Sequence, residues 1–154
     1  MNTYIPKKNG AKALIIVGNK ILLYRRDNKQ TIPYPDHWDF FGGGVEGNES
    51  FEDALRREIK EEISLEPERV WYIGKKIYQG NRITTRFICW ISENTLKRAH
   101  FGDEGQEFRL FTLKEIVDLK IVPAYKRFIS LNETIIEEIL LGKKVDPAQF
   151  VIED

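Results

Sequence analysis

Three glutamates stand close together in one segment of the chain, at Glu58, Glu61 and Glu62. On a helical wheel of residues 50–65, at about 100° per residue, one broad side is apolar and consists of Phe51, Ala54, Leu55, Ile59, Ile63 and Leu65. Glu58 and Glu62 project from the middle of this side, one turn apart, and Glu61 lies at its flank. An ordinary solvated position therefore does not explain the first two glutamates.

A pair of buried carboxylates needs a positive partner. Burying an unpaired carboxylate costs several kcal/mol, and two of them one turn apart repel each other. Arg57 lies around the helix and is predicted to be a poor partner for both Glu58 and Glu62. A divalent cation would neutralise the pair, because Mg²⁺ binds a few carboxylates together with substrate phosphates and water. A lysine or arginine from another part of the chain would also neutralise the pair. The helix alone does not decide between a metal ion and a basic side chain.

Three consecutive glycines, Gly42, Gly43 and Gly44, precede this helix. Glycine permits tight turns and close backbone approach. The run fits an ordinary loop, and it also fits a loop that brings a backbone carbonyl or amide up to a metal ion or phosphate.

Together these residues resemble the Nudix box, G-x5-E-x7-R-E-U-x-E-E-x-G-U, where U is aliphatic. Eight of its nine defined positions match over 23 residues, at Gly43, Glu49, Arg57, Glu58, Ile59, Glu61, Glu62 and Leu65. Ser64 departs from the pattern, because the family usually ends the helix there with a glycine. A left-handed serine costs about 1 kcal/mol or less and touches no ligand. Phe41 replaces a proline found in many relatives, and we expect this change to alter the nearby substrate pocket.

The resemblance implies a hydrolase that cleaves a diphosphate bond with the help of Mg²⁺, or Mn²⁺ in its place. The metal ligands that it implies are Gly42, Glu58, Glu61 and Glu62. Glu61 is a ligand or holds the attacking water. Arg57 orients the glutamates, and pairing with Glu49 is the expected means. A bound metal ion lowers the pKa of water and neutralises phosphate oxygens.

A general base is often supplied in this family by a loop outside the box. The best candidate is Glu104, in the segment 100–106, with Asp103, His100 or a box glutamate as rivals. An acidic surface turn explains this segment equally well.

Four further residues are weaker candidates for contacts with the substrate. Arg25 ends a strand and Arg86 lies on another, and each could face the phosphates, although a solvated strand end is the commoner role. Trp38 and Phe40 could stack on a nucleobase, although core packing is the commoner fate of such rings.

The substrate that we expect is a nucleoside triphosphate or a modified, including oxidised, nucleotide. A nucleotide sugar such as GDP-mannose is the alternative. A non-catalytic sensor of nucleotides or metabolites is the alternative of another class, and it is disfavoured because such proteins usually lose box glutamates. An isopentenyl-type isomerase would need a reactive cysteine, and Cys89 lies within an apolar strand.

Composition limits the remaining possibilities. The 154 residues fit one domain over 1–154, and 24 basic residues balance 24 acidic ones, so nothing drives the chain as a whole toward nucleic acid or a membrane. One cysteine excludes an internal disulfide, and no apolar run reaches the roughly 18 residues of a membrane span. A cytoplasmic enzyme of small nucleotide-type substrates is expected. Many relatives form dimers, so a homodimer is compatible with the sequence.

The elements that position these residues follow from hydrophobic periodicity and turn residues. Strands are predicted over 11–18, 20–26, 37–41, 70–79, 82–91 and 108–111, and helices over 50–63, 112–119, from Pro123 onward, and over 134–141, where Thr134 is the expected cap. Residues 27–36 are expected to form a loop. This order predicts an α/β fold of the Nudix type, an α/β/α sandwich with a mixed β-sheet flanked by helices.

Overall fold

A seven-stranded mixed sheet forms the centre of the computed structural model, which describes residues 5–152. The strands are β1 (Gly10–Val17), β2 (Lys20–Arg25), β3 (Trp38–Asp39), β4 (Phe41–Gly44), β5 (Arg69–Ile77), β6 (Ile83–Trp90) and β7 (Glu107–Phe111). They run in the order β3-β2-β1-β6-β5, while β4 pairs with β1 and β7 with β2. The β1–β6 pair is parallel and the other pairs are antiparallel.

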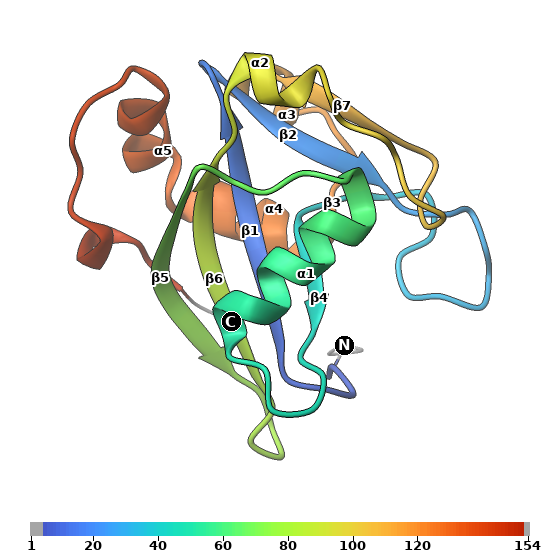
Figure 1. Cartoon of the computed structure of the whole chain (residues 1–154). Helices are drawn as coiled ribbons and strands as arrows, with labels where there is room; N and C mark the ends of the chain where they lie inside the picture. The colour runs from blue at the N-terminus through green and yellow to red at the C-terminus, as the bar shows by residue number, and fades with distance from the viewer. Residues whose placement is uncertain (1–4, 153–154) are drawn as a thin grey trace.

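Helices cover both faces of the sheet (Figure 1). They are α1 (Phe51–Ile63), α2 (Glu93–Leu96), α3 (Leu113–Ile116), α4 (Pro123–Leu131), α5 (Glu133–Leu140) and the 3-10 turn η1 (Pro147–Gln149). One apolar cluster joins α1 to the sheet, and a larger one joins α3, α4 and α5 to the opposite face. The expected α/β fold with a mixed sheet between helices is confirmed. No helix within residues 5–152 is long and apolar enough to cross a membrane.

The ends of α1 follow from local sequence. Ser50 caps the start, where its Oγ accepts a hydrogen bond from the backbone N–H of Asp53 at 3.0 Å. Ser64 ends the helix in the left-handed conformation, with φ 61° and ψ 30°. The serine therefore adopts the backbone that the glycine of the box usually supplies.

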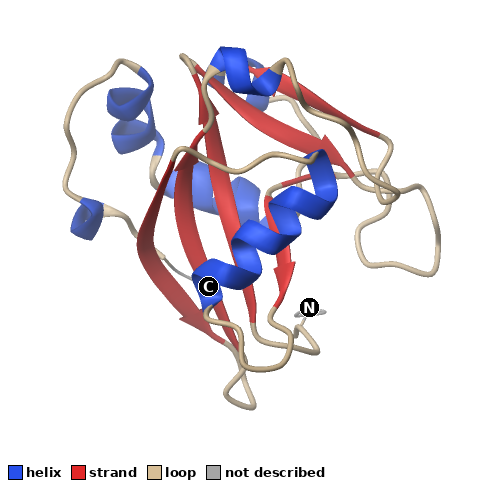
Figure 2. Cartoon of the chain, viewed as in Figure 1, coloured by secondary structure: helices blue, strands red, loops and turns tan. Residues whose placement is uncertain are grey.

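Three details differ from the elements predicted by sequence. The strand expected over 37–41 is two strands, because β3 pairs with β2 whereas β4 turns to pair with β1. The helix α2 was not expected. Thr134 was the wrong cap: Asn132 precedes α5, and no side chain caps that helix. Residues 26–37 form the expected loop between β2 and β3 (Figure 2).

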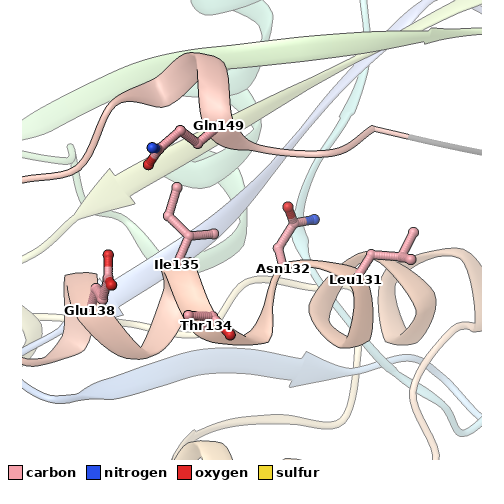
Figure 3. Close-up of a pocket in the computed structure, with 6 residues that line it drawn as sticks. All are labelled: Leu131, Asn132, Thr134, Ile135, Glu138 and Gln149. Carbon is pink, nitrogen blue, oxygen red and sulfur yellow. The ribbon is translucent and has the colours of Figure 1, made fainter.

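The buried Asn132 fastens the end of the described chain. Its amide donates to the carbonyl of Val151 at 2.9 Å, and its Oδ1 accepts from the Val151 N–H at 2.7 Å. A shallow hollow of about 320 Å³ lies beside it, between α5 and Gln149 (Figure 3). The hollow lacks a group of charged residues, since Glu138 is the one ionisable side chain among those that line it.

Candidate active site

The two inward glutamates of α1 lie against the glycine strand β4. The carboxylate of Glu62 accepts a hydrogen bond from the backbone N–H of Gly42 at 3.0 Å. A Cβ atom on Gly43 would lie 2.5 Å from the carboxyl carbon of Glu58. At Gly42, φ is 129° and a Cβ would overlap the carbonyl oxygen of Ala11. Glycine is therefore required at both positions for the strand and the carboxylates to approach this closely.

Both carboxylates are less stable as anions than an exposed glutamate is. Burial raises the pKa of Glu62 to about 8, although Lys12 and the Gly42 N–H act in the opposite direction. Burial also raises the pKa of Glu58, although Arg57 lowers it. The negative charge at this position is incompletely compensated by the protein.

Arg57 connects the glutamates of the box. Its Nε donates to Glu49 at 2.7 Å, which confirms the expected pair. Its Nη1 donates to Glu58 at 3.0 Å, so the prediction that Arg57 is a poor partner for Glu58 was wrong. The long side chain of Arg57 carries its guanidinium along the helix surface to Glu58. A wheel drawn from Cα positions does not represent this reach. Its hydrogen bond with Glu49, followed by those with Glu58 and Glu61, raises the pKa of Arg57.

Glu61 shares the Nη1 of Arg57 with Glu58, at 3.3 and 3.0 Å, but it is more exposed than Glu58. Its side chain is 59% exposed and pairs with Arg57 at 3.3 Å. Within the described chain, no three His, Cys, Asp or Glu side chains are grouped so that they could hold a metal ion by themselves. Two carboxylates beside a backbone strand nevertheless fit Mg²⁺, which commonly takes one or two carboxylates and completes its shell with phosphates and water.

A cavity of about 740 Å³ opens beside Glu58; Glu62 is not among its lining residues, but Gly42, which donates to Glu62, is. Gly42, Gly43, Gly44 and Glu58 line one part of it, and the start of α4 lines another. Glu104 also lines the cavity, whereas its rivals Asp103 and His100 are not among its lining residues.

Backbone hydrogen bonds hold the segment 100–106 in place. The N–H of His100 donates to the carbonyl of Ile63 and that of Gly102 to the carbonyl of Glu62, at 3.1 and 2.8 Å. At the other end, the N–H of Gln106 donates to Arg25 at 2.8 Å. The loop thereby joins the end of α1 to the end of β2 and leaves Glu104 at the cavity.

A buried charged network, not expected from sequence, forms another part of the cavity wall. Asp39 accepts hydrogen bonds from Lys12 at 3.2 Å, Arg26 at 3.0 Å and Tyr24 at 3.3 Å, and all four residues line the cavity. Burial alone would lower the pKa of Lys12, but Asp39, Tyr24, Tyr125 and Glu62 outweigh it and raise that pKa. The available signal was a lysine within an otherwise apolar strand, at position 12.

The four weaker candidates lie in different places. Trp38 and Phe40 are 7% and 1% exposed in the core cluster beneath α4, so they do not line the cavity. Arg25 pairs with Glu107 at 3.0 Å and is also outside it. Arg86 is 3% exposed and does not line the cavity either, but it packs over the ring of Tyr125, which does.

Cys89 is buried in the cluster under α1, and burial raises the pKa of its thiol to about 12. It therefore lacks the accessible thiolate that cysteine chemistry requires.

Comparisons with known proteins agree with this architecture. A family model described as the NUDIX domain matches residues 6–131. Nucleoside triphosphatase NudI from Escherichia fergusonii is 60% identical over 117 residues, covering 76% of this chain and 69% of the relative. An ADP-ribose pyrophosphatase from Methanocaldococcus jannaschii is 31% identical over 137 residues, covering 81% of this chain and 76% of the relative.

A solved structure shows the same likeness. A mutT/nudix family protein from Listeria innocua superimposes with a TM-score of 0.68 and 25% identity, covering 90% of this chain and 99% of the other. The fold, the box and these relatives lead to one assignment: the chain belongs to the Nudix family and is a hydrolase that acts on nucleotide substrates.

Proposed function

We propose that the protein hydrolyses a diphosphate bond of nucleoside triphosphates, or of modified nucleotides, with Mg²⁺ as its cofactor and Mn²⁺ as a substitute. The carrying observation is the pair Glu58 and Glu62, two incompletely neutralised carboxylates packed against β4 beside a large cavity. A divalent cation removes the cost of burying both charges.

The chain's own residues have separate roles in this reaction. Glu58, Glu62 and the Gly42 carbonyl hold the metal ion, and Arg57 fixes Glu58 through their 3.0 Å hydrogen bond. The ion supplies charge neutralisation of the phosphates and a lowered pKa for water. Glu104 accepts a proton from the attacking water at the cavity. We assign Glu61 the supporting role of holding Arg57, since their side chains pair.

The charge of the cavity supports a polyphosphate substrate. Its basic lining residues are Lys7, Lys8, Lys12, Arg26, Lys76 and Arg127, and its acidic ones are Asp39, Glu58 and Glu104. The excess of basic residues contrasts with the zero net charge of the chain. The similarity to a nucleoside triphosphatase over 76% of the chain supports the same choice. A nucleotide sugar or ADP-ribose remains the alternative substrate class, the latter because of the similarity to an ADP-ribose pyrophosphatase.

A panel of substrates tests this proposal. The protein is incubated with nucleoside triphosphates, oxidised nucleotides, nucleotide sugars, ADP-ribose and dinucleoside polyphosphates, with Mg²⁺ or with EDTA, and products are separated to identify the broken bond. We expect Mg²⁺-dependent release of pyrophosphate or phosphate from triphosphates. Glu62→Gln should lower kcat on the order of 10³-fold, because a ligand of the ion is lost.

Glu66→Gln is the matched control, since Glu66 is 69% exposed just after the same helix. It should leave turnover unchanged. Cleavage of nucleotide sugars or ADP-ribose alone would replace the triphosphate assignment. Tight binding of nucleotide without turnover would favour the sensor, and absence of Mg²⁺ binding would contradict the metal site.

Cytoplasmic location, a homodimer and the lack of binding to nucleic-acid polymers or membranes belong to the same proposal. The homodimer rests on the resemblance to a family in which many members form dimers, and the other expectations rest on the balanced composition of the chain and on its lack of a long apolar run.

A further inference from the structure

Arg86 is a buried arginine that no part of the proposed reaction uses. It lies on β6 and is 3% exposed. Its Nη1 is shielded from solvent and has no hydrogen-bond partner among residues 5–152. A guanidinium carries five N–H donors and no acceptor. A buried donor without an acceptor destabilises the protein unless a ligand supplies one.

The surroundings of Arg86 belong to the cavity. Thr84, two residues earlier on the same face of β6, lines it, and so does Lys12, the register partner of Arg86 on β1. The ring of Tyr125, another lining residue, lies 4.8 Å from the guanidinium carbon. Arg86 is not itself a lining residue, but it lies directly behind three residues that are, so that a ligand reaches it by displacing part of this wall.

The position of Arg86 relative to the metal-binding end identifies the part of the substrate near it. Gly42, Lys12 and Arg86 are consecutive register partners across β4, β1 and β6. Neighbouring strands are roughly 4.8 Å apart, so Arg86 lies about 10 Å from Gly42 along the sheet. When the diphosphate is bound at Glu58 and Glu62, the base is the part of the nucleotide farthest from these glutamates. A nucleoside that extends along the sheet toward β6 therefore places its base, and not its sugar, near Arg86.

Chemistry favours a base over a second phosphate at this position. Stacking on Tyr125 leaves the in-plane N–H groups of Arg86 for binding, and these match the flat edge of a base. Tyr78 and Tyr125 add aromatic surface to the same part of the cavity. A donor-only group pairs with a carbonyl or ring nitrogen, as arginine does with guanine O6 and N7, and it meets the amino group of adenine or cytosine unfavourably.

We propose that Arg86 determines base specificity by donating hydrogen bonds to the carbonyl at C6 of a purine or C4 of a pyrimidine, so that guanine, hypoxanthine, uracil and thymine are preferred over adenine and cytosine, which carry an amino group there. This inference rests on the proposed hydrolysis of nucleotides and adds to it the class of nucleobase.

Two pairs of nucleotides test the inference, because each pair exchanges a carbonyl for an amino group at nearly constant size: dUTP with dCTP, and dITP with dATP. We expect kcat/KM to favour the keto member by about tenfold or more in both pairs. Arg86→Met should reduce this ratio to near one, mainly by lowering kcat/KM for the keto members. Because the ratio compares two substrates on one protein, a partly folded sample does not alter it.

Arg69→Met is the control. The guanidinium carbon of Arg69 lies 4.8 and 4.6 Å from the ring centroids of Trp71 and Trp90, and neither of these rings lines the cavity, whereas the Tyr125 ring beside Arg86 does. The control variant should keep the wild-type ratio. Arg86→Lys, which retains the charge without the planar fork, should behave as Arg86→Met does.

Three results would overturn the inference: a wild-type enzyme without keto preference, a preference that survives Arg86→Met, or an equal loss on all four nucleotides with an intact fold. The last would make Arg86 a phosphate contact. If none of the four nucleotides is hydrolysed, their dissociation constants, measured with Ca²⁺ in place of Mg²⁺, give the same comparison of keto and amino bases. Failure of the proposed function and failure of this inference are thereby distinguished.

Discussion

A buried acid, Asp39, and a partly buried acid, Glu62, lie near the same cavity, and their charges are compensated to different extents. Asp39 is 2% exposed and accepts hydrogen bonds from Lys12, Arg26 and Tyr24, as well as from the Phe40 N–H at 2.7 Å. Glu62 accepts one hydrogen bond, from Gly42, and its pKa is raised to about 8 by burial. The first acid is compensated within the protein, and the second is compensated only in part, by Lys12 and the Gly42 N–H.

The difference distinguishes a structural charge from a binding charge. A buried acid with its own cations stabilises one arrangement of the chain, and removing it leaves those cations uncompensated. A buried acid without them gains a partner only when a cation binds. Burial by itself therefore does not mark a candidate metal site, whereas burial with incomplete compensation does.

The largest expected effect on stability is at the compensated acid. Asp39→Asn removes the charge that faces Lys12 and Arg26, so the free energy of unfolding should fall by about 3–5 kcal/mol. Urea unfolding measures this change.

The double variant Asp39→Asn with Lys12→Met is the matched control. It removes one of the two orphaned cations and should recover part of the lost stability. A loss below about 1 kcal/mol in the single variant would mean that Asp39 does not compensate the charges of Lys12 and Arg26 in the folded protein.

A third acid, Glu104, sharpens the comparison because it reaches the cavity from a loop. Glu104→Gln should lower kcat about 100-fold, the lower end of the range for a general base. The free energy of unfolding should change by less than about 0.5 kcal/mol, since the loop is held by backbone hydrogen bonds. Steady-state kinetics and urea unfolding on one preparation give both quantities.

Asp103→Asn is the control for this variant, because Asp103 is adjacent in sequence but does not line the cavity. It should keep its turnover. Near-normal turnover of Glu104→Gln would exclude Glu104 as the base, and a large loss in Asp103→Asn would transfer the role to that residue.

The compensated acid was harder to predict from sequence than the uncompensated ones. Glu58 and Glu62 are one helical turn apart, so the period of a single helix reveals their conflict with the apolar side. Asp39 and Lys12 are 27 residues apart. Their pairing depends on β4 turning from β3 to lie along β1, and no local pattern encodes that turn.

The same reasoning explains the outcomes for the elements and side chains. The other strands and α1 follow from periodicity and capping, and the structure confirms them to within a residue or two, whereas the strand predicted over 37–41 is two strands, β3 and β4. The position of Glu61 depends on how the flexible Arg57 side chain distributes its donors among Glu49, Glu58 and Glu61. That distribution is a property of rotamers, which a helical wheel does not contain.

The smallest expected effect is a dependence of stability on pH that the uncompensated acid alone should produce. The folded pKa of Glu62, about 8, is above the ordinary value of 4.5 for glutamate in an unfolded chain. The folded state therefore binds this proton more tightly, and the free energy of unfolding should fall as pH rises from 4.5 to 8 in EDTA. Because Glu62 is only partly buried, screening should limit the fall to about 2 kcal/mol.

Glu62→Gln isolates that contribution, because the amide does not titrate. Urea unfolding at pH 5 and pH 9 in EDTA should show that wild type loses about 2 kcal/mol relative to the variant. Mg²⁺ should raise the free energy of unfolding of the wild-type protein more at pH 9 than at pH 5, because the ion binds the carboxylate and competes with the proton. Equal pH profiles for the two proteins would mean that Glu62 is already neutralised within the chain, as Asp39 is, and the contrast between the two acids would not hold.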